Sequence, residues 1–178
     1  MQIVSSFAVH AATPADLPAI VDIYDEVIAN STAVYSLTAS SIEERRAWFQ
    51  TRTSAGYPIL VAAAPDGVLG FASFGEFRGA WQGYRYSVEH SVHVREDQRG
   101  RGIGSCLIQE LFPLAAAMGK HVMIGGIDAA NEGSLRLHQR LGFERAAHFR
   151  EVGRKFGRWL DLVFVQRFLD HPGADRAD

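Results

Sequence analysis

The sequence predicts a single domain of mixed α/β class, because helical and strand-like segments alternate along the whole chain without internal repeats. A chain of 178 residues suits one domain and can bury a sizeable core. Its composition, 47% apolar and 21% charged, is typical of globular proteins. We expect the domain to span residues 1–170, and the small and polar residues 171–178 to form a disordered tail.

The first third of the chain predicts one strand and two helices. A short strand is expected at residues 3–9, followed by Thr13 and Pro14, which suit the N-cap and first position of a helix. Apolar residues then recur at helical spacing over residues 17–28. Residues 41–44, Ser-Ile-Glu-Glu, have the pattern of a capping box and begin the second helix.

The middle of the chain predicts a hairpin, a further strand and a third helix. Residues 58–64 and 68–77 have strand character, and the Pro-Asp-Gly turn at 65–67 joins them. Another strand is expected over residues 84–95. Apolar periodicity then predicts a helix over residues 103–118.

The last third adds a strand at residues 121–127, a fourth helix and a final pair of strands. The two final strands are expected within residues 143–169, around a turn at 153–157. Three polar residues of the fourth helix share one face, since they are three and four positions apart: Asn131, Ser134 and His138.

The clearest chemical signal is the basic, glycine-rich segment Arg99-Gly-Arg-Gly-Ile-Gly104, which follows a strand and opens directly into a helix. Backbone N–H groups at a helix start lack partners, and the helix dipole favours negative charge there. Glycine lets the backbone approach a ligand closely, and two arginines add positive charge. We therefore expect this loop to bind a pyrophosphate.

The spacing of the glycines decides between pyrophosphate ligands. No lysine follows them, as a Walker loop would need. The glycines at 100, 102 and 104 also differ from the Gly-x-Gly-x-x-Gly spacing of a dinucleotide site. A nucleotide-binding protein is thus the weaker interpretation.

The spacing Arg99-x-x-Gly102-x-Gly104 resembles a signature of the GCN5-related N-acetyltransferases (GNAT), which bind acetyl-coenzyme A. The segment 131–143, from Asn131 to Phe143, resembles the second half of the same core. Further segments resemble the phosphinothricin and methionine sulfoximine acetyltransferase branch, and the resemblance covers about residues 7–169: 56–61, 70–74, 88–92 and 155–161. It implies a bent mixed central sheet with helices on both faces, and a homodimer.

Composition limits the other function classes. A net charge of −2 gives no general reason to expect nucleic acid or a membrane as partner. The single cysteine excludes an internal disulfide and suits a reducing compartment. The chain has neither a signal-peptide pattern nor an apolar run long enough to span a bilayer. These features indicate a cytoplasmic protein.

Acetyl transfer to an amine needs a base, since an α-amine is protonated at neutral pH. Glu89 is our candidate, because it lies just before the glycine loop, where the related enzymes carry an acidic residue. Strand alternation puts Glu89 and His93 on one face and His90 on the other, unless a β-bulge intervenes. The alternative is that Glu89 only pairs with a nearby arginine.

The resemblance also implies where acetyl-CoA binds. His138 takes a position where many relatives have a tyrosine that protonates the departing thiolate, and an imidazole can do so near neutral pH. The alternative is a histidine that only packs beside the coenzyme. In a gap beside the strand, the pantetheine arm would meet the backbone of Val92, His93 and Val94 and the side chain of Asn131. The pyrophosphate would lie on Arg99, Gly100, Arg101, Gly102, Ile103, Gly104 and Ser105.

The acceptor is expected at residues 77–86, where arginines and aromatic residues alternate with glycines. Arg78 matches an arginine of this branch, and a guanidinium can bind a carboxylate through two parallel hydrogen bonds. The alternative for the aromatic residues is ordinary packing. The expected acceptor site consists of Tyr35, Phe77, Arg78, Glu89 and His90.

Two other interpretations carry less weight. His90 and His93 face opposite sides of a regular strand, so we predict no metal site. Cys106 follows the glycine loop at a helix start, which can activate a thiol, but we favour a packed small side chain over a covalent acetyl-cysteine route.

The sequence therefore predicts an N-acetyltransferase. It would move the acetyl group of acetyl-CoA to the α-amino group of a small amino acid or analogue, by direct attack in a ternary complex. Phosphinothricin and methionine sulfoximine are the expected acceptors, which implies a role in detoxification. Peptide N-termini or polyamines are alternative acceptors. A non-catalytic acetyl-CoA sensor is the alternative from another class.

Overall fold

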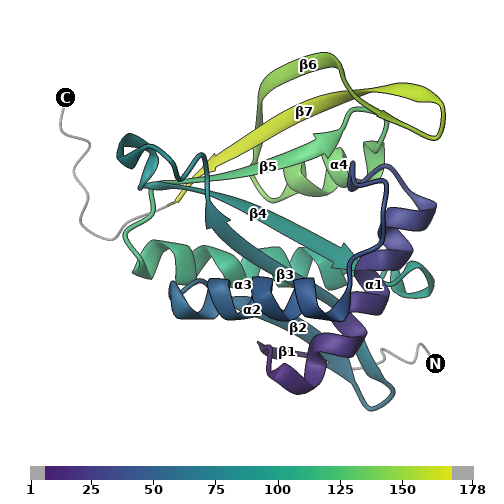
Figure 1. Cartoon of the computed structure of the whole chain (residues 1–178). Coiled ribbons are helices and arrows are strands. Elements are labelled where there is room, and N and C mark those ends of the chain that lie inside the picture. Colours follow the sequence, from purple (N-terminus) through teal and green to yellow (C-terminus); the bar gives the residue numbers. More distant parts are fainter. Residues whose placement is uncertain (1–6, 170–178) are drawn as a thin grey trace, which may run out of the picture.

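The computed structural model describes residues 7–169, so the start of the expected first strand, the end of the expected domain and the tail lie outside the described residues. Within that range, seven strands form one mixed sheet in the order β1-β2-β3-β4-β5-β7-β6 (Figure 1). The pair β4–β5 is parallel and the others are antiparallel. The strands are β1 (Ala8–Ala11), β2 (Ile59–Ala64), β3 (Gly67–Glu76), β4 (Ser87–Val94), β5 (Val122–Asp128), β6 (Glu144–Lys155) and β7 (Arg158–Phe168).

Helices cover both faces of this sheet, as predicted. Strand alternation on β2 sends Val61 to one face and Leu60 to the other. Val61 packs with Ile20 of α1 and Phe49 of α2, whereas Leu60 belongs to the core that contains Leu107 of α3. The α-helices of the described residues are α1 (Leu17–Asn30), α2 (Ile42–Ser54), α3 (Ile103–Ala117) and α4 (Glu132–Arg140).

Capping residues mark where the first two helical segments of the chain begin. The Glu44 amide donates to the Ser41 hydroxyl at 3.1 Å, and the Ser41 amide donates to the Glu44 carboxylate at 2.8 Å, so the predicted capping box begins α2. Thr13 forms a similar box with Asp16, but it begins a 3₁₀ turn (Pro14–Asp16) that precedes α1. None of the helices in residues 7–169 combines the length and apolar character that a membrane span needs.

The hairpins show where the sequence prediction was right and where it was wrong. The β2–β3 hairpin is confirmed, with Ala64 opposite Gly67. β4 begins at Ser87 and not at 84, because residues 82–84 form a 3₁₀ turn closed by backbone hydrogen bonds. The final turn is shorter than predicted, since Lys155 pairs with Arg158 and the strand irregularity lies earlier, between 149 and 153.

Candidate active site

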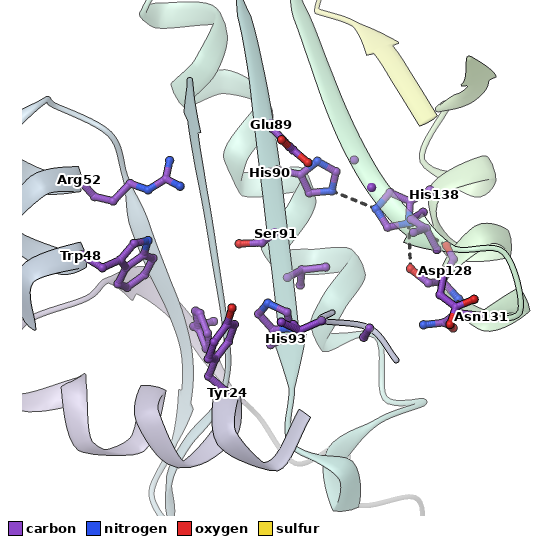
Figure 2. A pocket seen from close by; sticks show the side chains of 18 of the residues that line it. Tyr24, Trp48, Arg52, Glu89, His90, Ser91, His93, Asp128, Asn131 and His138 are labelled. Atoms are coloured by element: carbon purple, nitrogen blue, oxygen red, sulfur yellow. Dashed lines mark hydrogen bonds between the residues drawn. The ribbon is translucent and has the colours of Figure 1, made fainter. Parts of the chain in front are cut away.

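The candidate site lies at a fork in the sheet, between β4 and β5. The two strands pair only through residues 87–89 and 122–124, although β4 continues to Val94 and β5 to Asp128. A cavity of about 380 Å³ opens beyond this short pairing, and α2, β4, β5 and α4 contribute its walls (Figure 2). The expected separation of β4 from its neighbour is thus confirmed.

Glu89 enters this cavity from β4 with a half-buried side chain. Burial raises the pKa of the Glu89 carboxyl, because desolvation penalises the charged form, while the Arg52 guanidinium opposes this shift. The salt bridges of the described residues do not include Glu89. A carboxyl with a raised pKa in a cavity is a suitable proton acceptor.

The faces of β4 follow the predicted alternation. The register with β3 is continuous over residues 88–94, so no bulge shifts this pairing. His93 points toward α1, where its ring lies 5.3 Å from that of Tyr24; it also lies 5.2 Å from the ring of Phe71 on β3. His90 points toward α4. Burial, with the nearby charges of Arg45 and Arg99, lowers the pKa of His93 to about 4, so its ring is neutral at pH 7.

His90 and His138 contact each other across the fork, and Figure 2 shows their rings turned toward one another. Their Nε2 atoms are 3.0 Å apart. His90 Nδ1 donates to the Ile124 carbonyl at 2.9 Å, and His138 Nδ1 donates to the Ser134 carbonyl at 2.7 Å. Burial lowers the pKa of both imidazoles. The structure therefore joins one predicted catalytic residue to one predicted acceptor residue.

A second cavity, of about 450 Å³, lies at the N-terminus of α3. Gly100 and Gly102 have φ values of +77° and +82°, a region in which glycine is favoured. Gly102 is the N-cap of α3, so the first amides of that helix point out of its end. Of the predicted coenzyme residues, all but Arg101 line this cavity: Val92, His93, Val94, Arg99, Gly100, Gly102, Ile103, Gly104, Ser105 and Asn131.

Arg101 does not line either of these two cavities. It is exposed, and its guanidinium donates to the Gln98 side chain. The two cavities share Ala33, Val92, His93, Asn131 and Ser134, so they adjoin along β4 and the start of α4. Together they join the N-terminus of α3, where the helix dipole favours negative charge, to the fork at Glu89.

Part of the predicted acceptor set lies outside the fork cavity. Arg78 is exposed, and its guanidinium lies 5.0 Å from the Trp81 ring. Phe77 packs against Tyr84 and Phe164. Tyr35, Phe77 and Arg78 do not line either of the two cavities.

Tyr35 packs against the C-terminal hairpin. Its hydroxyl donates to the Asp161 carbonyl at 2.9 Å, and its ring lies against Gly153. Burial, with the charges of Asp128 and Asp161, raises the pKa of its hydroxyl to about 12. Tyr35 thus links the loop after α1 to β6 and β7.

Three residues of α2 line the cavity but were missed by sequence reasoning. Arg45, Trp48 and Arg52 are three and four positions apart, so they share one face of the helix. The Arg45 guanidinium lies 3.5 Å from the centre of the Tyr24 ring, a cation–π contact. This helical spacing was visible in the sequence and was the signal that could have found them.

The remaining candidates have little chemical support. Burial raises the pKa of the Cys106 thiol, opposite to what a nucleophilic cysteine requires. Among residues 7–169, no group of three or more His, Cys, Asp or Glu side chains has the arrangement of a metal site. The chemistry at the fork therefore rests on Glu89 and the histidine pair.

The profile of the Acetyltransferase (GNAT) family matches residues 20–143 of this sequence. The chain belongs to the GNAT acetyltransferase family. This placement confirms the resemblance seen in the glycine loop and in residues 131–143. It also explains the architecture, because a solved GNAT structure has the same fold: a phosphinothricin acetyltransferase from Sinorhizobium meliloti in complex with AcCoA superposes with a TM-score of 0.90 at 37% identity, over 97% of this chain and 94% of that one.

Curated relatives narrow the position of this GNAT protein within the family. It is 49% identical to an L-methionine sulfoximine/L-methionine sulfone acetyltransferase of Pseudomonas aeruginosa, over 93% of this chain and 96% of the relative. It is 45% identical to the L-amino acid N-acyltransferase MnaT of Escherichia coli, over 92% of this chain and 94% of that relative. The protein is therefore a GNAT acetyltransferase that is similar to relatives over nearly their full length.

Proposed function

We propose that this protein transfers the acetyl group of acetyl-CoA to the α-amino group of a small amino acid or analogue, such as methionine sulfoximine or phosphinothricin. The observation that carries this proposal is the fork cavity. This cavity holds the Glu89 carboxyl, whose pKa is raised, and it adjoins the second cavity at the N-terminus of α3. The names of the close relatives support the same acceptor class.

The second cavity suits acetyl-CoA as co-substrate. Free amides at the start of α3 and the Arg99 guanidinium favour an anionic pyrophosphate. Beyond Glu89, β4 lacks a paired strand on its β5 side, so the backbone of Val92, His93 and Val94 can bind the pantetheine arm. Asn131, which caps α4, lines both cavities and lies where the arm would pass.

The reaction then needs little more than positioning and proton transfer. Glu89, as base, takes a proton from the substrate ammonium and leaves a neutral amine. The amine attacks the thioester carbonyl, and the tetrahedral intermediate loses the CoA thiolate, which must gain a proton. His138 is the proposed acid for that step. Direct attack in a ternary complex requires no acetylated enzyme residue, in agreement with the raised pKa of Cys106.

The acceptor carboxylate has two candidate partners. Arg52 lines the fork cavity and interacts electrostatically with Glu89. Arg78 lies outside that cavity, in the segment where the family resemblance predicts the acceptor. We favour Arg52, because it can bind the carboxylate while the α-amine faces Glu89.

The deciding experiment measures release of CoA thiol from acetyl-CoA with a panel of acceptors. We expect saturable turnover with methionine sulfoximine, methionine sulfone and phosphinothricin, and its loss when the acceptor carboxylate is amidated. Arg52→Met should raise the acceptor KM at least about tenfold, the effect of about 1.4 kcal/mol of lost binding. A larger effect of Arg78→Met would move the carboxylate site to residues 77–86.

The alternatives give different results with the same panel. Turnover confined to peptides or polyamines would keep the acetyltransferase and refute the proposed acceptor. Acetyl-CoA binding without turnover on any amine would support a sensor.

We further infer a cytoplasmic homodimer that detoxifies amino-acid analogues, from the low net charge, the single cysteine and the exposed apolar side chains of the β6–β7 hairpin.

A further inference from the structure

The contact between His90 and His138 engages every nitrogen of both rings. Their Nε2 atoms face each other at 3.0 Å, and each Nδ1 faces a backbone carbonyl, of Ile124 at 2.9 Å and of Ser134 at 2.7 Å. Both rings are buried and pack against Phe143, with centroids 5.2 Å and 5.1 Å away. The two Nε2 atoms are therefore the ring nitrogens of this pair that no carbonyl occupies, and both residues line the fork cavity.

Counting hydrogens shows what this arrangement lacks. A carbonyl oxygen only accepts, so each Nδ1 carries a hydrogen. The Ser134 hydroxyl also lies 3.4 Å from His138 Nδ1, but the carbonyl at 2.7 Å is the closer partner and sets the tautomer. A neutral imidazole has a single N–H, which leaves only lone pairs on the two facing Nε2 atoms. Two buried lone pairs at 3.0 Å repel each other, whereas one proton between them would form a hydrogen bond. The pair thus has a place for one further proton.

The surroundings limit the pair to that one proton. Burial lowers the pKa of both rings, so the resting pair is neutral and has room for a proton, while a second extra proton would put two cations 3.0 Å apart. Asp128 Oδ2 is buried and has no hydrogen-bond partner among the described residues, so a carboxylate of the same cavity favours a transient cation. The titratable and charged groups that line the cavity with the pair are Tyr24, Arg45, Arg52, Glu89, His93 and Asp128.

His90 also fixes the apex of the fork. Ile124 is the last β5 residue that pairs with β4, and its carbonyl accepts from the His90 ring. The next residue, Gly125, leaves space for that ring, because a Cβ there would lie 2.7 Å from His90 Cε1. The ring is therefore held where the strands separate, directly against His138.

We propose that His90 is a positioning residue that makes His138 part of a one-proton relay from the attacking amine to the departing thiolate. This inference rests on the proposed function. Attack forms the N–C bond and leaves an excess proton on nitrogen, and departure of the thiolate breaks the C–S bond. The histidine pair takes this proton from the substrate nitrogen, holds it between the two Nε2 atoms and releases it to the sulfur. Glu89 accepts the earlier proton, which the substrate ammonium loses before attack.

The first test needs no acceptor. In protein labelled with ¹⁵N in its seven histidine rings, NMR should find the unusual Nδ1–H tautomer in both His90 and His138 at neutral pH. As the pH falls, the two rings should gain one proton together, in a single shared step. An Nε2–H tautomer in either ring at neutral pH, or two independent titrations, would overturn the proposal.

The second test separates proton transfer from positioning. In His90→Gln, the amide can still donate to a carbonyl or to His138, but it cannot hold the proton in transit. We expect kcat to fall at least about tenfold, given the usual contribution of acid–base catalysis, with the KM for acetyl-CoA within about twofold. His10→Gln, an exposed histidine on β1, is the matched control and should match the wild type.

The outcomes distinguish this inference from the proposed function. If the wild type acetylates the acceptor panel and His90→Gln has the same kcat, the relay is refuted and the function stands. If the wild type acetylates no amine, the function fails and the relay role in acetyl transfer fails with it. The NMR result remains interpretable in both cases, because it reports on the protein alone.

Discussion

At Glu89, burial acts against stability and in favour of catalysis. Its folded-state pKa is raised, so the stabilising effect of the protonated form is lost as the pH rises through that pKa. The same shift brings the carboxyl closer to the pH at which a base works well. Activity should therefore rise with pH through a value above that of an ordinary glutamate.

We predict that Glu89→Gln separates these two effects. The neutral amide removes the base, and kcat should fall about 100-fold, within the usual range for a general base. It also removes a charge that is costly to bury, so the thermal midpoint at pH 7 should be at least as high as that of the wild type. A variant with wild-type kcat across the pH range would exclude the base role.

Single residues differ in how well the sequence predicted them. The alternation of β4 placed Glu89 and His93 on one face because a strand has only two faces. Arg52 was missed although its spacing was visible, since a helix pattern does not state which other segment its polar face will meet. The His90–His138 contact was out of reach, because the two residues are 48 positions apart in sequence.

Among the elements, the strand β6 is attached to the end of α1 by a buried lysine. Lys155 Nζ donates to the carbonyls of Ile28, Ser31 and Val34 at 2.6, 2.8 and 2.8 Å. These carbonyls lie at the C-terminal end of α1 and in the following loop, where a positive charge is favourable. Val34 also lines the fork cavity, so this lysine supports one wall of the site.

We predict that Lys155→Met destabilises the protein by about 3 kcal/mol, because it leaves three carbonyls without their charged donor. Urea unfolding would measure the loss. The chain has one other lysine, Lys120, which donates to the Arg85 carbonyl and is the matched control, with an expected change below about 1 kcal/mol. Equal effects of the two substitutions would contradict the special role of Lys155.

Element boundaries were predictable where a local signal exists. The capping residues Ser41 and Glu44 fixed the start of α2, and a proline-containing turn fixed the β2–β3 hairpin. The late start of β4 and the irregularity of β6 were not predicted. The start of β4 is delayed by the 3₁₀ turn at 82–84, and the irregularity of β6 contains Glu151 at positive φ, for which a non-glycine sequence gives no signal.

At the scale of the whole molecule, the β6–β7 hairpin is the feature that a monomer explains least. It extends along one end of the sheet, and β6 is an edge strand (Figure 1). Five apolar side chains of this hairpin are strongly exposed, which is unusual for a surface that faces only water: Phe149 at 45%, Val152 at 52%, Phe156 at 59%, Trp159 at 59% and Phe168 at 49%. These side chains suit the proposed contact with a second copy of the chain.

We predict that Trp159→Asp converts a dimer into a monomer, since it puts a charge among the exposed apolar side chains of the hairpin. Sedimentation should give twice the chain mass of 19.6 kDa for the wild type and the chain mass for the variant. Leu37→Asp is the control, because Leu37 is 72% exposed but lies outside the hairpin. A wild type that sediments as a monomer at micromolar concentration would refute the dimer. A Leu37 variant that dissociates as well would refute the assignment to the hairpin.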